Sequence, residues 1–305
     1  MSYLAPDAAA LRAGNLRGAG LMMLSMAAFT LNDTSVKFLG DSLPLAQILF
    51  LRGMVSILLL TVVAWGMGAI RLDLPAREWR LIGLRSLADL AATYFFLNAL
   101  LHIPLANITA IMQALPLTVT LGAALFFREP LGWRRLSAIA IGFGGVLMIV
   151  RPGAEGFDAW SLYALGAVAS VTLRDLAARR LAASTPSATA ALAGALLITV
   201  AAGGVTLWQG GQPLTPVNAG IAALAGVFIF VGYLSSVATM RAGEVGFVSP
   251  FRYTGLVWAL ILGFVVFGDW PDGMTLAGAG IVVATGLFTL YRERRVALAK
   301  RSGKG

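Results

Sequence analysis

Long apolar runs, each close to the roughly 20 residues that a helix needs to cross a bilayer, follow one another along this chain. Short segments with proline, glycine and charged residues separate these runs and leave no room for a soluble domain. The pattern predicts an all-α integral membrane protein with ten transmembrane helices in antiparallel hairpins. We place the helices, within a few residues, at 18–40, 44–67, 78–100, 104–127, 131–150, 159–180, 187–208, 217–240, 245–267 and 273–291.

Two stretches of the sequence resemble each other, and both end long apolar runs. Thr30–Leu39 (TLNDTSVKFL) returns 142 positions later as Thr172–Leu181 (TLRDLAARRL). A second match, at an offset of 140, joins residues 124–149 to residues 264–289. Self-similarity at a fixed offset is the signature of a repeated structural unit, so we expect two related halves.

The two halves are predicted to be residues 1–152 and 153–305, each with five transmembrane helices. Because five is an odd number, the second half must enter the membrane from the opposite face. Such inverted repeats build secondary transporters, which bind their substrate near the middle of the membrane and open to alternate sides.

Composition and charge agree with a membrane location, since 58% of the 305 residues are hydrophobic and only 12% are charged. The net charge of +9 comes from Lys and Arg that gather, apart from Lys37 and Arg151, on the side of both termini. By the positive-inside rule we expect both termini in the cytoplasm and the chain in the bacterial inner membrane. The basic tail from Arg292 to Lys304 is interpreted as touching anionic lipid, so no nucleic-acid partner is expected.

Two motifs point to a known family. An acidic residue follows the fourth span, in Phe127–Pro130 (FREP), and a glycine-rich fifth span runs from Gly142 to Arg151. With ten spans in two halves, these motifs resemble the EamA-type transporters of the drug/metabolite transporter superfamily. The resemblance covers nearly the whole chain and implies a secondary transporter. Members of that family export amino acids and other metabolites, or take up vitamins and nucleotide-like compounds.

The sequence contains no recognisable catalytic arrangement. Its one histidine, His102, lies in a tight loop, and cysteine is absent. Metal-ligand spacings and a phosphate-binding loop between a strand and a helix are also missing. We therefore expect no enzyme activity, no cofactor and no metal, and energy for transport that comes from a gradient or from exchange.

Charged residues inside the spans are the main candidates for function, because a charge at bilayer depth is costly. Arg85 and Asp89 stand one helical turn apart on the third span, so they share one face of the helix. They are expected either to neutralise each other and fix helix packing, or to bind a polar substrate. Arg52, on the second span, is assigned to gating or coupling.

Asp33 and Asp175 hold equivalent positions in the two repeats and are predicted to gate or couple transport at opposite faces. Each has a basic residue one turn later, Lys37 or Arg179, so a structural ion pair is the alternative. Lys37 is expected to reach water, which would leave Asp33 to bind and release a proton. Facilitated exchange without a proton fits the sequence as well.

Prolines interrupt the fourth and ninth spans at Pro116 and Pro250. A proline inside a helix frees a carbonyl and bends the helix, and a freed carbonyl suits a polar cavity. We therefore expect these two spans to line the substrate site, although interhelical hydrogen bonds are an alternative role for their polar residues. The predicted lining residues are Thr109, Gln113, Ser249, Arg252, Tyr253 and, as an aromatic that can stack on a substrate, Trp258.

Buried arginines beside aspartates favour an amphipathic zwitterion or a carboxylate over a lipophilic cation as the substrate. We predict a secondary transporter for a small amino-acid-like metabolite, with export as the direction that the resemblance implies. The alternatives are an uptake carrier for a vitamin or nucleotide-like compound, a passive channel, and a membrane-embedded enzyme. The chain is expected to act as a monomer or homodimer, with a small-molecule substrate and the lipid bilayer as its partners.

Overall fold

The computed structural model describes residues 8–128, 132–151, 159–182 and 184–301, which contain helices and no strand. The helices are α1 (Ala8–Leu39), α2 (Leu45–Gly66), α3 (Ala76–His102), α4 (Leu105–Met112), α5 (Leu115–Phe127), α6 (Trp133–Val150), α7 (Trp160–Ala178), α8 (Ser187–Gln209), α9 (Pro216–Ala242), α10 (Val245–Val248), the 3-10 helix η1 (Ser249–Tyr253), α11 (Thr254–Phe267) and α12 (Gly273–Arg301).

The predicted all-α fold with ten spans is confirmed. Eight spans are single helices, α4 and α5 together form the fourth span, and α10, η1 and α11 together form the ninth. The predicted boundary between the halves, at residues 152 and 153, lies outside the described residues, as does the Glu129-Pro130 part of the acidic motif. The first and last helices extend several residues beyond the predicted spans.

Seven of the described spans are long and apolar enough to cross a membrane by length and composition alone. The other three, α1, α3 and α7, carry charged residues within the helix, among them Asp33, Asp89 and Asp175. A charged helix is tolerated in a bilayer when its polar face turns towards other helices. Accordingly α1 packs along α9, and α3 packs along α7.

The fourth and ninth spans are broken next to the two prolines. α4 ends at Met112, and α5 begins two residues after Gln113 with Pro116 in its first turn. The ninth span changes to a 3-10 helix at Ser249, and Pro250 again lies in its first turn. Proline cannot donate to the preceding turn, so the helix ends or tightens at these points. The two broken spans contact each other through α4 and α11.

Contacts between helices follow the repeat. If each helix of the first half is matched with the fifth span after it, the packing of α1 on α9 corresponds to that of α7 on α3. The packing of α2 on α9 likewise corresponds to that of α8 on α3, and α2 and α6 pack on their own equivalents, α8 and α12. This symmetry defines two five-span repeats related by a pseudo-two-fold axis in the membrane plane.

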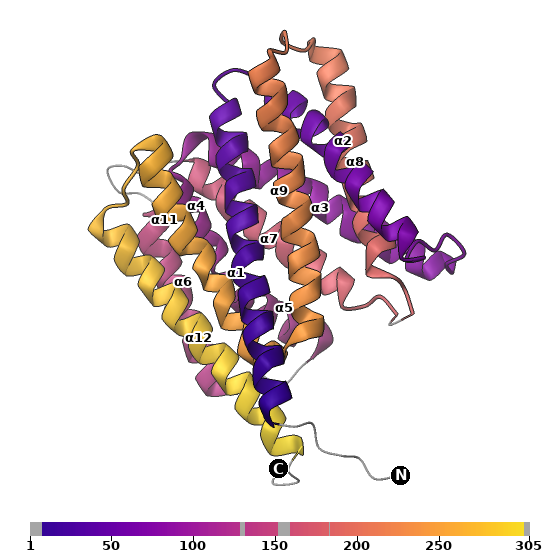
Figure 1. Cartoon of the computed structure of the whole chain (residues 1–305). Coiled ribbons are helices and arrows are strands. Elements are labelled where there is room, and N and C mark those ends of the chain that lie inside the picture. The colour runs from indigo at the N-terminus through magenta and orange to yellow at the C-terminus, as the bar shows by residue number, and fades with distance from the viewer. Residues whose placement is uncertain (1–7, 129–131, 152–158, 183, 302–305) are drawn as a thin grey trace.

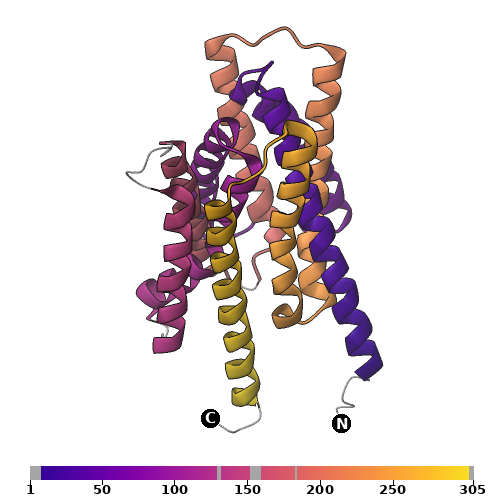
Figure 2. The same cartoon turned by 90° about the vertical axis from the view of Figure 1, so that its left-hand side faces the viewer.

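The start of α1 and the end of α12 lie at the same end of the helix bundle (Figures 1 and 2). We call this the terminal end and the other the opposite end. Chain order then fixes the direction of every span: α3 runs from the terminal to the opposite end, whereas α9 runs from the opposite to the terminal end. The two repeats therefore have opposite orientations.

Candidate functional site

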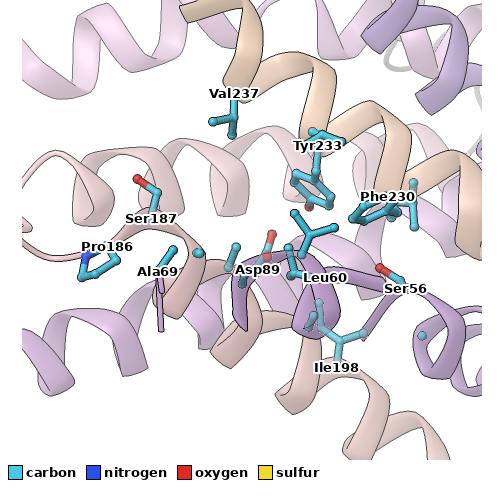
Figure 3. A pocket seen from close by; sticks show the side chains of 18 of the residues that line it. Ser56, Leu60, Ala69, Asp89, Pro186, Ser187, Ile198, Phe230, Tyr233 and Val237 are labelled. Carbon is cyan, nitrogen blue, oxygen red and sulfur yellow. The ribbon is translucent and has the colours of Figure 1, made fainter. Parts of the chain in front are cut away.

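A cavity of about 610 Å³ lies among α2, α3, α8 and α9. Its volume is within the roughly 300–1,000 Å³ range of small-molecule sites. Figure 3 shows Phe230, Tyr233 and Val237 of α9 near Leu60 of α2, with Ala69, Pro186 and Ser187 at one end and Asp89 behind. The further lining residues are Leu49, Arg52, Gly53, Ser56, Val63, Ala64, Met67, Arg85, Thr93, Ala188, Ala191, Ala195, Ile198, Thr199, Ile229, Leu234, Ala238, Met240 and Arg241.

The cavity reaches the terminal end of the bundle. Its lining there includes Met67 just after α2, Ser187 at the start of α8, and Met240 near the end of α9. Towards the opposite end the walls meet closely: a Cβ atom on Gly226 of α9 would stand 2.7 Å from Val55, and one on Gly203 of α8 would stand 2.9 Å from Phe50. The helices converge there because glycine allows backbones to approach.

Most of the cavity wall is apolar, and three of its four charged residues gather in one region, with Arg241 at the terminal end. Three charged residues that the sequence singled out, Arg52, Arg85 and Asp89, line it together with Tyr233. Asp89 is 8% exposed and Arg52 is 7% exposed, so both are largely withdrawn from solvent. Buried charges of this kind require partners. The partners show how the two repeats contribute to the site.

Asp89 forms its ion pair with Arg174 of α7, whose Nη1 donates to Oδ1 at 2.9 Å. The same guanidinium donates from Nε to Asp175 at 3.0 Å. Arg85 does not neutralise Asp89, which corrects the first of our two expectations for this pair. Its Nη1 instead donates to the main-chain carbonyl of Ala190 at 2.9 Å. Arg85 is thus a cavity cation whose recorded hydrogen bond is to a neutral group.

Arg52 is held by a residue of the first repeat. Its Nη1 donates to the side-chain oxygen of Asn32 at 2.7 Å, and the Asn32 nitrogen donates to Asp33 at 2.9 Å. Asn32 and Arg174 are repeat equivalents, each directly before the aspartate of its motif. Neither residue was predicted from the sequence. The signal for both was the one position at which TLND and TLRD differ, between the identical Leu and Asp.

Lys37 is half-buried, and its ammonium, which we expected to reach water, bonds to main-chain carbonyls. Its Nζ donates to the carbonyl of Leu100 at 3.0 Å and to that of Ile103 at 2.6 Å, and lies 5.5 Å from the centroid of the Phe267 ring. These carbonyls end α3, where a cation is favoured by the helix dipole. Lys37 therefore ties three spans together at the opposite end, and Asp33 has Asn32 as its hydrogen-bond donor.

The remaining predicted residues lie around the two helix breaks and do not line this cavity. Gln113 is buried at 7% exposure, and its amide nitrogen lies 3.8 Å from the position of a Cβ on Gly255 of α11. Tyr253 is buried, and its hydroxyl has no hydrogen-bond partner within the described part of the chain, whereas Arg252 is exposed. The structure therefore brings Arg52, Arg85 and Asp89 together. It places elsewhere Thr109, Gln113, Ser249, Arg252, Tyr253 and Trp258.

A side chain near the start of α2 bonds to the loop that follows α8, and a side chain near the start of α8 bonds to the loop that follows α2. Gln47 of α2 exchanges two hydrogen bonds with the main chain of Gln212 after α8, at 2.8 and 2.9 Å. Its repeat equivalent, Thr189 of α8, accepts from the Arg71 amide after α2 at 3.0 Å and donates to Ala69 at 3.4 Å. α2 and α8 are therefore joined at both ends.

Ten spans in two inverted repeats, with a cavity whose charges come from both repeats, define a membrane transport protein of the inverted-repeat class. Comparison with known families agrees: the description "EamA-like transporter family" matches residues 16–151 and again 158–291. The chain belongs to the EamA-like transporter family.

Full-length relatives include transporters with different named substrates. The chain is 27% identical to the S-adenosylmethionine uptake transporter of Rickettsia conorii, over 92% of this chain and 94% of that protein. It is 26% identical to the riboflavin transporter of Vibrio cholerae, over 94% and 97%. It is 25% identical to a pseudopaline exporter of Pseudomonas aeruginosa, over 92% and 99%.

A solved crystal structure, 20% identical in sequence, superposes over 92% of this chain and 98% of its own with a TM-score of 0.62. That likeness supports the fold. The relatives together establish a multi-pass membrane transporter that acts on a small molecule, and they include both uptake and export proteins.

Proposed function

We propose that this protein is a secondary transporter for a small amphipathic metabolite with a carboxylate, either an amino-acid-like zwitterion or a simple carboxylate. The observation that carries the proposal is the cavity with Arg52, Arg85 and Asp89 in one region and a mostly apolar wall elsewhere. Arginine binds carboxylates through two parallel hydrogen bonds. The apolar walls suit the rest of an amphipathic molecule.

Counterflow in proteoliposomes tests this proposal. Vesicles loaded with one unlabelled amino acid or carboxylate at a time are mixed with a trace of the same labelled compound. A carrier with alternating access accumulates label transiently, whereas a passive channel does not. The proposal fails if no compound of this class shows counterflow, and transient accumulation of one of them supports it.

A pair of glycine substitutions links transport to the cavity. A Cβ on Gly194 of α8 would stand 3.2 Å from Asp89 Oδ2 and 3.4 Å from Arg85 Nη1. Gly194→Ala should therefore crowd the charged region and lower the exchange rate by about tenfold or more. Gly204→Ala, on the same helix with nothing within 4 Å of its Cβ, is the matched control and should exchange normally. Equal rates in the two variants would contradict the placement of the site.

A second candidate is a carrier for vitamins or nucleotide-like compounds. The relatives named for S-adenosylmethionine and riboflavin favour it, because they align with nearly the whole chain. The same vesicles, loaded with S-adenosylmethionine or riboflavin, distinguish the two candidates. Counterflow of either compound, with none for amino acids or carboxylates, would replace the first proposal with the second.

We further propose that both termini are cytoplasmic in the bacterial inner membrane, that export is the direction, and that Asp33 couples transport to protons. Lys and Arg gather at the terminal end, and cytoplasmic loops carry such an excess. Orientation is tested with an impermeant label on a terminal tag.

Coupling is tested by an imposed pH gradient: the wild type should respond, and Asp33→Asn should not. A wild-type rate that ignores the gradient contradicts coupling.

A further inference from the structure

The charges around the cavity are paired unevenly. Three carboxylates, Asp33, Asp89 and Asp175, lie near three arginines, Arg52, Arg85 and Arg174. Coulomb attraction is strong in a low-dielectric interior, so each carboxylate engages a nearby guanidinium. The distribution of these contacts decides which cation faces the substrate without a carboxylate partner.

Arg174 engages two of the three carboxylates at once. It donates to Asp89 at 2.9 Å and to Asp175 at 3.0 Å, and its side chain is 23% exposed. It does not line the cavity. It therefore stands behind the wall and holds Asp89 from the α7 side. Asp89, the one carboxylate among the residues that line this cavity, is thereby committed to an ion pair.

Arg85 is the cation of α3 that this arrangement leaves available, whereas Arg52 shares Asn32 with Asp33. Arg85 lies one turn before Asp89 on the same face of α3. A Cβ atom on Gly194 would stand 3.4 Å from Arg85 Nη1 and 3.2 Å from Asp89 Oδ2, so both side chains face this glycine. Without Arg174, Asp89 would have Arg85 as its nearest cation on that helix face. Because Arg174 holds Asp89, Arg85 donates its hydrogen bond to the main-chain carbonyl of Ala190.

The first repeat has a neutral residue at the equivalent position. Asn32, the equivalent of Arg174, donates to the motif aspartate Asp33 and accepts from Arg52 of the neighbouring helix α2. Arg174 instead reaches from the second repeat to Asp89 of α3. The change from TLND to TLRD therefore places a positive charge behind the wall and gives Asp89 its partner.

We propose that Arg174 is a positioning residue that sets the substrate's charge: by holding Asp89 it leaves Arg85 to bind the anionic group of an organic carboxylate. This inference rests on the proposed function and narrows it from zwitterion or carboxylate to a substrate with net negative charge. Removal of Arg174 should let Asp89 neutralise Arg85 and abolish the preference for anions.

The test uses three probes with one phenyl ring and different charges: 3-phenylpropionate, phenylalanine and phenethylamine. Dissociation constants are measured by titration calorimetry on the full chain in lipid nanodiscs. The wild type should bind 3-phenylpropionate at least about tenfold more tightly than phenethylamine, as a charge-assisted bidentate contact implies. Arg174→Gln should reduce this ratio by about tenfold.

Asp89→Asn is the decisive partner substitution. Alone it should keep the anion preference, because Arg85 stays available. Combined with Arg174→Gln it should restore the ratio that the single Arg174→Gln variant has lost. A structural role cannot give this rescue, since the double variant lacks the same ion pair as either single variant. Arg71→Gln with Asp73→Asn removes an exposed ion pair, 50% and 74% exposed, and is the control that should leave the ratio unchanged.

Three results would overturn the inference: a wild type that does not prefer the anion, an Arg174→Gln variant with an unchanged ratio, or a double variant without rescue. The counterflow experiment is independent of these results. If counterflow occurs but Arg174→Gln leaves the ratio of dissociation constants unchanged, the proposed role of Arg174 is wrong and the proposed transport function stands. If the ratios change as expected but no counterflow occurs, the proposed transport function is wrong and the role of Arg174 in binding stands.

Discussion

The last turns of α3 and α9 are repeat equivalents that face opposite ends of the membrane, and they differ in burial. In α3, Leu97 is 2% exposed and Leu100 is fully buried. Their equivalents 140 positions later in α9, Val237 and Met240, are 45% and 46% exposed and line the cavity. One sequence pattern therefore closes the opposite end and leaves the terminal end open. The two repeats are therefore packed differently at these equivalent positions, an asymmetry that fits the proposed alternating access.

The middle of the same two helices differs in chemistry. Asp89 of α3 lines the cavity, and its equivalent in α9 is Ile229, which also lines it. Arg85 corresponds to Ala225, which is fully buried. The frame of the protein is therefore symmetric and the lining of its cavity is not. On the proposed function, the symmetric frame would allow the change of access, and the charged residues of α3 would recognise the substrate.

The largest expected effect separates the closed end from the open end. Leu100→Ala removes a fully buried side chain from the core and should lower the free energy of unfolding by about 2–5 kcal/mol. Met240→Ala, at the exposed equivalent position, should cost less than about 1 kcal/mol. Unfolding in lipid nanodiscs measures both. Similar losses in the two variants would mean that the two ends are equally packed.

An intermediate effect is expected at the hydrogen bonds that join α2 and α8. Gln47→Ala leaves the main-chain N–H and carbonyl of Gln212 without their partner and should cost about 1–3 kcal/mol. Thr189→Ala, at the equivalent site, should cost about 1 kcal/mol, because one of its two contacts is long at 3.4 Å.

Hydrogen exchange provides the readout for this second comparison. Amide protection should fall at residues 210–214 in Gln47→Ala and at residues 69–73 in Thr189→Ala. Protection that falls at both ends in either variant would show that the two fastenings are not independent.

The smallest expected effect depends on pH and concerns the opposite end. The backbone N–H of Thr275, followed by the Arg151 guanidinium, holds the pKa of Asp272 below its ordinary value. A depressed folded-state pKa stabilises the fold above the unfolded pKa of about 4, and this contribution is lost as the pH falls further.

Asp272→Asn removes that contribution. Its melting temperature should lie a little below that of the wild type at pH 7, and the gap should close between about pH 4 and pH 3. A gap that stays constant down to pH 3 would show that Asp272 acts as a helix cap alone.

The spans, the two helix breaks and the inverted repeat followed from the sequence because hydrophobic length, proline and self-similarity act locally. The cost of charge in a bilayer singled out Arg52, Arg85 and Asp89, which line the cavity. The same rule singled out Asp33, Asp175 and Arg252, which do not line it. The pairing of these charges did not follow from the sequence. Asp89 and Arg174 are 85 positions apart in sequence, and which cation meets Asp89 depends on the packing of α3 against α7. Spacing within one helix favoured Arg85, and tertiary contact overrode it.

Cysteine accessibility tests most directly the claim that the cavity opens at the terminal end alone. The chain contains no cysteine, so Val237→Cys and Leu97→Cys can each be made as the single thiol. In nanodiscs, where a water-soluble maleimide reaches both membrane faces, Val237→Cys should react at least about tenfold faster than Leu97→Cys, since the latter must wait for an opening motion. Equal rates, or faster reaction at Leu97→Cys, would contradict the account.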